Sequence, residues 1–139
     1  MARIELMSWE RARSLAAPIR FEVFVREQRV PAEIELDEQD AISIHAIAFD
    51  GEEAIGTGRL LPDGHIGRMA VLKEWRGRGI GGLILTELMR AAMRRGDREI
   101  ALSAQVHAVA FYRAHGFEPV GDIYQEAGIA HQAMVRALA

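Results

Sequence analysis

Hydrophobic and polar positions change their period several times along the chain, and these changes predict the order of its elements. Residues 4–8 alternate between apolar and polar side chains, as a short strand does. From Trp9 to Gln28 the apolar residues fall at helical spacings, and Pro18 is expected to kink that helix or divide it in two. Residues 32–41 are acidic and have no clear period, so they are expected to form a loop.

Three runs typical of strands, joined by tight turns, come next. The first two, residues 42–49 and 54–61, are separated by Asp50-Gly51, a dipeptide typical of hairpin turns. A second turn at residues 62–64 leads into a third run at residues 65–71. Together they predict an antiparallel meander.

The second half of the chain opens with a helical pattern that starts at Ile80 and ends at Gly96, a residue suited to a helix C-terminus. A short strand, a short helix and two closing strands are then expected at residues 100–104, 107–115, 117–125 and 129–138. The order β-α-β-β-β-α-β-α-β-β contains no internal repeat and no linker. It predicts a single mixed α/β domain over residues 1–139.

Composition narrows the classes of function. The chain has no cysteine, which excludes disulfides, thiolate nucleophiles and cysteine-bound zinc. A formal net charge of -3 provides no basic surplus for nucleic acid. There is no signal-peptide core and no run of about 20 apolar residues, so a cytoplasmic protein without membrane contact is expected. No two histidines have metal-ligand spacing on one helix, and no metal is expected.

The strongest chemical signal is the segment Arg76-Gly77-Arg78-Gly79-Ile80-Gly81-Gly82, which follows a strand and opens a helix. No Ser, Thr, Asp or Asn is placed to cap the free N–H groups at that helix start. Glycines let the backbone approach a ligand closely, and a helix N-terminus favours an anion. The segment therefore predicts a phosphate or pyrophosphate site; the alternative is a glycine-rich turn that water solvates.

Context narrows the kind of phosphate ligand. Gly77, Gly79 and Gly82 satisfy G-x-G-x-x-G, the dinucleotide-binding pattern. In a dinucleotide fold that loop follows the first strand of a βαβ unit, whereas here a meander precedes it and only about 60 residues follow. A P-loop is excluded because no Lys-Ser or Lys-Thr follows the glycines, and a kinase glycine loop lies between strands.

The same segment resembles motif A of the GNAT superfamily, the acetyl-CoA-dependent N-acetyltransferases. The signature of that motif is Q/R-x-x-G-x-G/A, and Arg76, Gly79 and Gly81 match it. Met69-Ala70-Val71 precedes the signature, as a strand does in these proteins. The order of the expected elements also resembles the GNAT fold over nearly the whole chain.

Other parts of the chain extend the resemblance. Ala110-Phe111-Tyr112, followed by Gly116-Phe117, resembles the A-x-x-F-Y-x-x-x-G-F region of motif B. Residues 23–31 are similar to the V-F-V-x-E-Q-x-x-P stretch of small bacterial GNAT proteins of the ElaA-like kind. Two further stretches recur in that group, Gln105-x-His107 and Glu126-x-Gly128-Ile129-x-His131-x-x-Met134.

The resemblance implies the GNAT acyl-CoA N-acyltransferase fold, a mixed but mostly antiparallel sheet of about six or seven strands flanked by helices. In that fold the third meander strand ends in a bulge and splays from the next parallel strand, and the pantetheine arm of CoA enters the gap. The N–H of Val71 would then bind the thioester oxygen. The implied acetyl-CoA contacts are Met69, Ala70, Val71, Arg76, Gly77, Arg78, Gly79, Ile80, Gly81 and Tyr112.

Tyr112 matches the family's usual general acid, which protonates the departing CoA thiolate; the alternative for Tyr112 is a core aromatic. The general base stays open, because residues 65–73 contain no carboxylate where some GNAT members carry one. Glu27 and His131 are placed first among the candidates, and each also has a purely structural alternative, such as a salt bridge for Glu27. The full set is Glu27, His45, His107, His131 and an ordered water.

These features predict an N-acetyltransferase that moves the acetyl group of acetyl-CoA directly to a primary amine. Without cysteine, no acetyl-cysteine intermediate can form. The alternative is a non-catalytic acyl-CoA-binding or sensing module, which needs the glycine segment but not Tyr112. The amine, small or peptidyl, is not identified by the sequence, and the resemblance also implies a homodimer. Acidic residues 33–40 form either a negative lip that attracts a cationic amine or a solvated loop.

Overall fold

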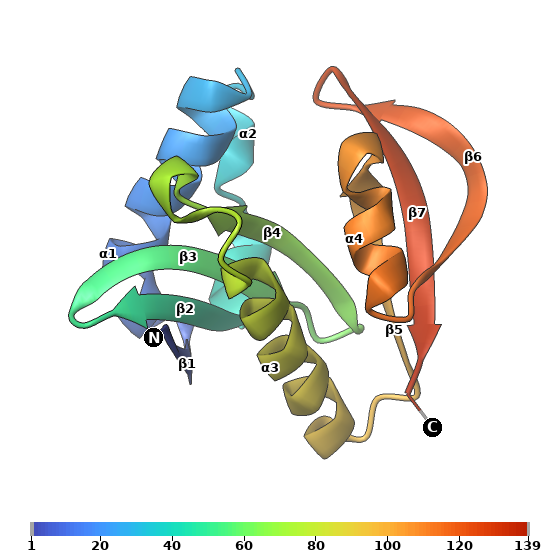
Figure 1. Cartoon of the computed structure of the whole chain (residues 1–139), viewed down its shortest axis with the longest axis horizontal. Coiled ribbons are helices and arrows are strands. Elements are labelled where there is room, and N and C mark those ends of the chain that lie inside the picture. Colours follow the sequence, from blue (N-terminus) through green and yellow to red (C-terminus); the bar gives the residue numbers. More distant parts are fainter. Residues whose placement is uncertain (1, 139) are drawn as a thin grey trace.

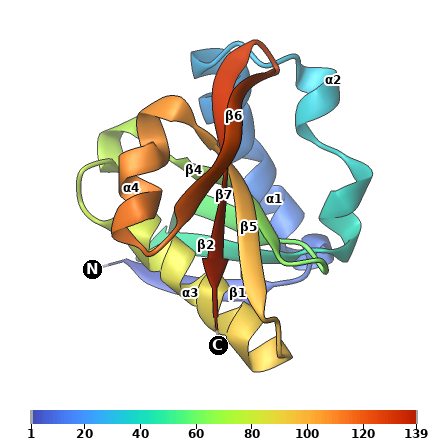
Figure 2. The same ribbon diagram turned by 90° about the vertical axis from the view of Figure 1, so that its right-hand side faces the viewer.

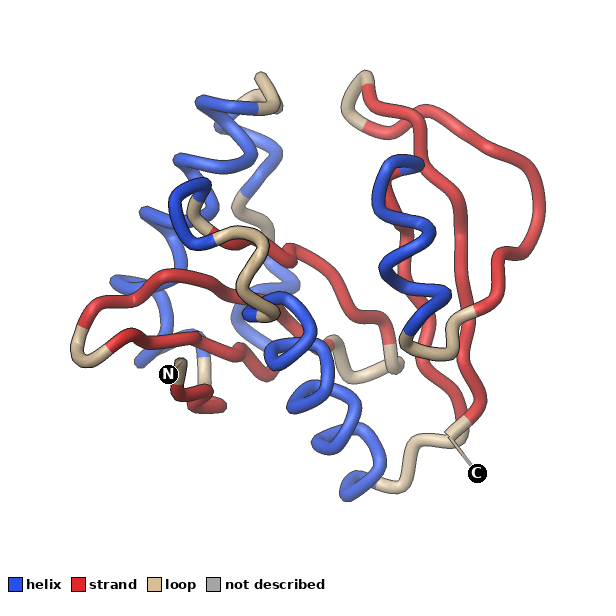
Figure 3. The backbone as a smooth tube through the Cα atoms, in the orientation of Figure 1, coloured by secondary structure: helices blue, strands red, loops and turns tan. Residues whose placement is uncertain are grey.

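The structure is a computed structural model that describes residues 2–138. Within that range, seven strands form one sheet in the order β1-β2-β3-β4-β5-β7-β6 (Figures 1 and 3). Every neighbouring pair is antiparallel except β4 with β5. The strands are β1 (Arg3–Met7), β2 (Ile44–Asp50), β3 (Glu53–Leu60), β4 (His65–Val71), β5 (Glu99–Gln105), β6 (Glu118–Glu126) and β7 (Ile129–Ala137).

Helices of three kinds flank the sheet. The α-helices are α1 (Trp9–Arg20), α2 (Ala32–Glu35), α3 (Ile80–Arg95) and α4 (Val109–Ala114). A π-helix spans Phe21–Glu27, and short 3₁₀-helices span Glu38–Ile42, Lys73–Trp75 and Val106–Ala108. The meander, the long helix ending at Gly96 and the mixed α/β class are thus confirmed.

The two long helices cover opposite faces of the sheet, and alternation along β2 shows why. Ala46 and Ala48 belong to the core that α3 covers, whereas Ile47 and Phe49 pack with α1. Successive side chains of a strand point to opposite faces, so apolar residues at every position require cover on both sides. Figure 2 shows the β5-β7-β6 part of the sheet in front, with α4 on one side and α2 on the other.

Pro18 does not divide the first helix, because α1 runs through it to Arg20 and continues directly as the π-helix. Pro18 lies on the exposed side, and its missing N–H removes one backbone hydrogen bond from the helix. The wider winding that follows ends with a bond from the N–H of Gln28 to the carbonyl of Val23, five residues back, at 3.1 Å. The predicted division into two helices is therefore wrong, and the structure shows instead a change to π-helical winding that begins at Phe21.

The acidic segment expected to be a loop contains α2 and the 3₁₀-helix Glu38–Ile42. Two of its carboxylates, Glu35 and Asp40, are buried. Arg20, also buried, donates to both of them, with 2.8 Å between Nη1 and Asp40 Oδ1. The expected loop is therefore wrong, and two of the carboxylates expected at a negative lip are buried with cationic partners, whereas Glu33 and Glu38 are exposed.

Two more arginines complete this ion-pair cluster. Arg59 of β3 donates to Asp37 and Asp40 at 2.7 and 2.9 Å. Arg68 of β4 donates to Asp37 at 3.1 Å and to the carbonyl oxygen of Glu35 at 3.0 Å. Burial acts to raise the pKa of Asp37 and Asp40, but hydrogen bonds and charge from the arginines lower it overall. The segment is thus fixed to the sheet mainly through charged contacts.

Within residues 2–138, no helix combines the length and the apolar character needed to cross a bilayer.

Replacing Arg20 with Leu should lower the free energy of unfolding by about 3–5 kcal/mol, because buried Glu35 would lose its closest cation and buried Asp40 would keep only Arg59. Urea denaturation measures this loss. Arg26→Leu is the control, since Arg26 forms only an exposed pair with Glu22 at 3.5 Å and should change stability by less than about 0.5 kcal/mol. Equal losses in the two variants would contradict the expected cost of leaving buried carboxylates without Arg20.

Candidate functional site

The strands β4 and β5 meet only briefly and then part (Figure 1). Their parallel pairing is confined to His65 with Ala101 and Ile66 with Leu102. On its other side, β4 stays paired with β3 as far as Val71, across a bulge where Arg68 has a φ of +50°. A bulge bends a strand and increases its twist. The predicted bulge and splay are therefore present.

The end of β4 presents backbone groups to this gap. The N–H of Leu72 donates to the carbonyl of Ile55 in β3 at 2.9 Å. Because backbone groups alternate in direction along a strand, the N–H and carbonyl of Val71 point away from β3, on the side of the gap. The Val71 carbonyl accepts a bond from Nε of Arg76 at 2.9 Å. Its N–H is left facing the gap, as an oxyanion donor requires.

Met69 and Ala70 lie on opposite faces of the same strand. Met69 packs against the core under α3, whereas Ala70 is buried with Ile19 and Val23 of the first helical segment. The strand edge between them borders the gap. The three predicted contacts Met69, Ala70 and Val71 thus lie along one wall of the opening.

The glycine segment has the geometry of an anion site. Gly77 and Gly79 have φ values of +77° and +80°, which any other residue adopts only with strain. α3 begins at Ile80 without a side-chain cap, and its first bond joins the N–H of Leu83 to the carbonyl of Gly79. Among residues 2–138, none accepts a hydrogen bond from the N–H groups of residues 77–82. Free donors at the positive end of a helix dipole fit a pyrophosphate.

Glycines in the first turn of α3 also let α4 approach closely. A Cβ at Gly81 would lie 3.6 Å from the ring of Phe111, and one at Gly82 would lie 3.2 Å from Nε2 of His115. The second distance is tighter than ordinary contact. This packing holds α4, and with it Tyr112, beside the glycine segment.

Tyr112 has a packed ring and a hydroxyl with no partner among the described residues. Its ring packs edge-on against Phe111 and Phe117, with centroids 5.0 and 5.9 Å away, at the margin of the main core. Its hydroxyl has no hydrogen-bond partner among residues 2–138. Burial raises the pKa of Tyr112 to about 12. The phenol is therefore protonated at neutral pH and has a proton to donate.

Glu27 forms an ion pair with Arg76, the structural alternative considered for it. The carboxylate and guanidinium are joined by two bonds of 2.8 and 3.0 Å, and the two side chains are 30% and 41% exposed. Arg76 is thus directed at Glu27 and at the carbonyl of Val71. Arg78, the other arginine of the segment, lies over the ring of Trp75 at 4.8 Å.

Two of the histidines proposed as bases differ in environment. His45 is buried, with Nε2 2.9 Å from the carbonyl oxygen of Asp40 and its ring 4.8 Å from that of Trp9. Burial lowers the pKa of His45. It belongs to the ion-pair cluster and is not exposed to the gap. His107 lies on the surface in the 3₁₀-helix after β5.

His131 lies in a polar group on β7, where it pairs with Gln105 at the end of β5. It is buried, with Nδ1 2.7 Å from the carbonyl oxygen of Ile129 and Nε2 3.7 Å from Glu126. Its ring stacks on Tyr124, with centroids 6.1 Å apart. The hydroxyl of Tyr124 is in turn hydrogen-bonded to Ser103 of β5. Of the two histidine candidates near the end of β5, His131 is the buried one and His107 is exposed.

Sequence reasoning missed a contact between Gln28 and Gln105, which lie 77 positions apart. The Nε2 of Gln105 donates to Oε1 of Gln28 at 2.8 Å, and the reverse bond is 3.4 Å long. Gln28 follows the π-helix and Gln105 ends β5. Both residues occur in stretches that resemble known proteins, but no local pattern shows that they meet.

The sequence profile of the acetyltransferase (GNAT) domain matches residues 11–138. The chain belongs to the GNAT family. The uncharacterized N-acetyltransferase YjcF of Bacillus subtilis is 42% identical over 122 residues, which cover 85% of this chain and 87% of YjcF. Protein ElaA of Escherichia coli is 30% identical over 126 residues, which cover 85% of this chain and 82% of ElaA. The predicted resemblance to ElaA-like GNAT proteins is thus confirmed.

Solved structures agree with this membership. The crystal structure of Escherichia coli ElaA has a TM-score of 0.87 and 26% identity, and the alignment covers 98% of this GNAT chain and 99% of that one. An acyl-CoA N-acyltransferase from Pseudomonas aeruginosa has a TM-score of 0.88 and 29% identity, with 99% and 100% covered. The predicted acyl-CoA N-acyltransferase fold is confirmed.

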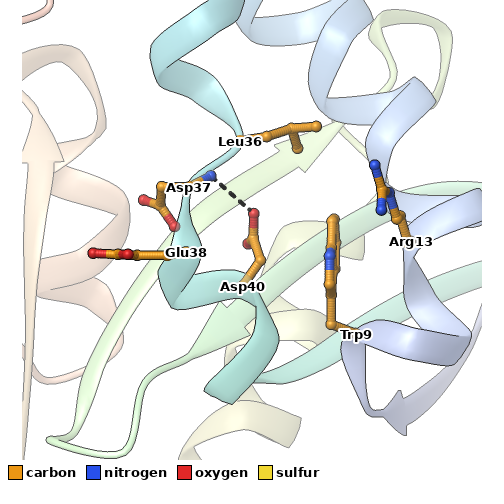
Figure 4. Close-up of a pocket in the computed structure, with 6 residues that line it drawn as sticks. All are labelled: Trp9, Arg13, Leu36, Asp37, Glu38 and Asp40. Atoms are coloured by element: carbon orange, nitrogen blue, oxygen red, sulfur yellow. Dashed lines mark hydrogen bonds between the residues drawn. The ribbon is translucent and has the colours of Figure 1, made fainter.

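A pocket of about 310 Å³ lies elsewhere on this GNAT protein (Figure 4). Its lining residues are Trp9, Arg13, Leu36, Asp37, Glu38 and Asp40, and none of them belongs to β4, β5 or the glycine segment. Figure 4 shows Trp9 and Arg13 on one side and the three carboxylates on the other. Asp37 and Asp40 already bind arginines, so the pocket is a depression beside the ion-pair cluster.

His45 should make folding sensitive to mild acid. Its folded-state pKa is lowered from 6.5, so the unfolded chain binds a proton that the folded chain rejects, and stability falls as pH drops below about 6.5. His45→Gln should remove this loss. The contribution of Asp37 and Asp40 is present above pH 3.8 and is lost only below it, because their pKa values are lowered. Urea unfolding of wild type and His45→Gln from about pH 7.5 to 4.5 tests the role of His45. Identical pH profiles for the two proteins would contradict that role.

Proposed function

We propose that this GNAT protein transfers the acetyl group of acetyl-CoA directly to a primary amine. The observation that carries the proposal is the gap between β4 and β5, bordered by the Val71 N–H and continuing into the free N–H groups of residues 77–82. Tyr112 supplies an unpaired, protonated hydroxyl from α4, which packs on the same glycine turn.

Substrate binding is assigned to backbone groups more than to side chains. Met69, Ala70 and Val71 form the wall along which the pantetheine arm lies, and Gly77 through Gly81 give their N–H groups to the pyrophosphate. Arg76 keeps the segment attached to the end of β4, and Arg78 adds positive charge near the phosphates. A side-chain cap at the helix start would compete with this ligand, and none is present among the described residues.

The chemistry follows from these groups. The amine nitrogen attacks the thioester carbon, and the carbonyl oxygen takes up the electron pair next to the Val71 N–H. The C–S bond then breaks, and Tyr112 gives its proton to the CoA thiolate. The attacking amine loses a proton to His131 or to an ordered water. Glu27 was the other leading candidate for this base, but its ion pair with Arg76 favours a structural role.

Two features favour an enzyme that works by direct transfer. The chain has no cysteine, so the acetyl group cannot form a thioester intermediate with the protein. A non-catalytic acyl-CoA-binding module would need the glycine segment but no proton donor. The hydroxyl of Tyr112, which no side chain or carbonyl among residues 2–138 binds, supports the enzyme over that module.

Tyr112→Phe should lower kcat about 10²-fold or more and leave the Kd for acetyl-CoA unchanged, because only the proton donor is lost. A thiol reagent can follow CoA release without background, since the protein has no cysteine. The assay uses a polyamine, an amino sugar and a lysine-containing peptide as trial acceptors.

Wild-type activity should not decline through ionisation of Tyr112 below about pH 10, since its pKa is about 12.

Tyr124→Phe is the matched control, because it removes a phenol that is already hydrogen-bonded to Ser103. This variant should retain most of the turnover. Equal kcat values for wild type and Tyr112→Phe would exclude Tyr112 as the acid. Binding of acetyl-CoA without transfer to any trial amine would favour the sensing module, and no binding of acetyl-CoA by the folded protein would overturn the proposal.

A further inference from the structure

We propose that two consecutive residues, Glu27 and Gln28, act as a clasp that holds the ends of β4 and β5 on either side of the gap. The clasp consists of Glu27 with Arg76 and Gln28 with Gln105. This inference rests on the proposed function, because it assigns these residues the task of positioning the thioester between the strands. They are positioning residues, which act through the backbone that they hold.

The first arm of the clasp reaches the end of β4. Both carboxylate oxygens of Glu27 accept bonds from the Nη atoms of Arg76, at 2.8 and 3.0 Å. The remaining nitrogen of that guanidinium, Nε, donates to the carbonyl of Val71 at 2.9 Å. All three nitrogens of Arg76 are therefore used. Because Arg76 also opens the glycine segment, this arm ties the π-helix both to β4 and to the predicted phosphate site.

The second arm reaches the end of β5. Gln28 and Gln105 exchange two amide hydrogen bonds, the shorter of which is 2.8 Å. Gln105 is the last residue of β5 and lies opposite His131 in β7. The arm therefore ends next to the polar group formed by His131 and Tyr124.

The backbone on both sides of Glu27 and Gln28 is held in an unusual conformation. Glu27 ends a seven-residue π-helix, a form that is rare and often occurs at functional sites. Arg29 follows with a φ of +64°, and the N–H of Val30 bonds to the carbonyl of Phe24 at 2.9 Å. A left-handed arginine persists only where its surroundings impose it. This turn directs two neighbouring side chains to two different strands.

The clasp matters because β4 and β5 are not hydrogen-bonded to each other near Val71 and Gln105. β4 and β5 pair at only two positions, both at the other end of β4. Beyond those positions their separation depends on the elements packed against them. A displacement of about 1 Å in a reacting group can cost about 100-fold in rate. Contacts that span the opening therefore control how the Val71 N–H meets the thioester.

The first test measures amide exchange in the protein without ligand. The N–H of Leu72, bonded to Ile55, reports on the end of β4. Glu27→Ala should speed its exchange severalfold while the midpoint of urea unfolding stays close to that of wild type. Glu22→Gln is the matched control, because it weakens an exposed ion pair on the same π-helix that does not reach β4. Equal exchange rates in Glu27→Ala and wild type would overturn the first arm.

The second test is a titration with acetyl-CoA. Glu27→Ala and Arg76→Ala should each raise its Kd about fivefold, in the upper range for an exposed ion pair. The double variant should be no weaker than Arg76→Ala alone, because both changes break the same arm. Glu27→Gln, which keeps a hydrogen-bond acceptor, should recover most of the affinity. Additive effects of the two alanine changes would contradict the clasp.

The second arm is tested in the same way with Gln28→Ala, Gln105→Ala and their combination. The two changes should be non-additive in the Kd for acetyl-CoA and in the exchange of the β5 end. If the wild-type protein fails to bind acetyl-CoA, the proposed function falls. The exchange measurements still decide whether the clasp exists, so the two failures are distinguishable.

Discussion

When two parallel strands part, the backbone groups along both edges lose their mutual hydrogen bonds, and other contacts have to hold the two halves of the sheet together. In this protein β4 and β5 share only two paired positions, and a bulge at Arg68 turns β4 away. The close packing of α4 on the glycine turn of α3 holds one side of the opening. The end of the π-helix holds the other. The separation of β4 from β5 therefore has two consequences. It leaves backbone donors free at the gap, and it makes the contacts of α4 and of the π-helix necessary.

The wall on the α1 side is held by charge where an apolar contact would be usual. Arg20, Arg59 and Arg68 meet Glu35, Asp37 and Asp40, so three cations oppose three anions in a largely buried cluster. Desolvating such groups is costly, and a cluster of this kind fixes one geometry more than it adds stability. Each buried charge is tolerated only while its oppositely charged partner is in place. The cluster therefore holds this wall in one position.

Local patterns predicted those parts of the protein that local forces determine. The Asp50-Gly51 turn, the alternation in β4 and the helical period from Ile80 to Gly96 led to the correct elements, and the helix start at Ile80 is uncapped, as the sequence indicated. What failed depended on partners far along the chain. Nothing near Asp40 in sequence indicates that Arg20 and Arg59 will neutralise it. Likewise, Glu27 has a plausible position for a base until Arg76 is seen beside it. Pro18 does not divide the first helix, because α1 continues past it directly into the π-helix.

The central claim is that the gap and the uncapped glycine segment together form a site for acetyl-CoA. Isothermal titration of the purified protein with acetyl-CoA, with NAD titrated in parallel, tests it most directly. The account predicts saturable heat with acetyl-CoA at one site per chain and none with NAD, because a single splayed opening leads to one pyrophosphate site. Heat with NAD alone would restore the dinucleotide interpretation of Gly77, Gly79 and Gly82. No heat with acetyl-CoA from correctly folded protein would contradict the claim itself.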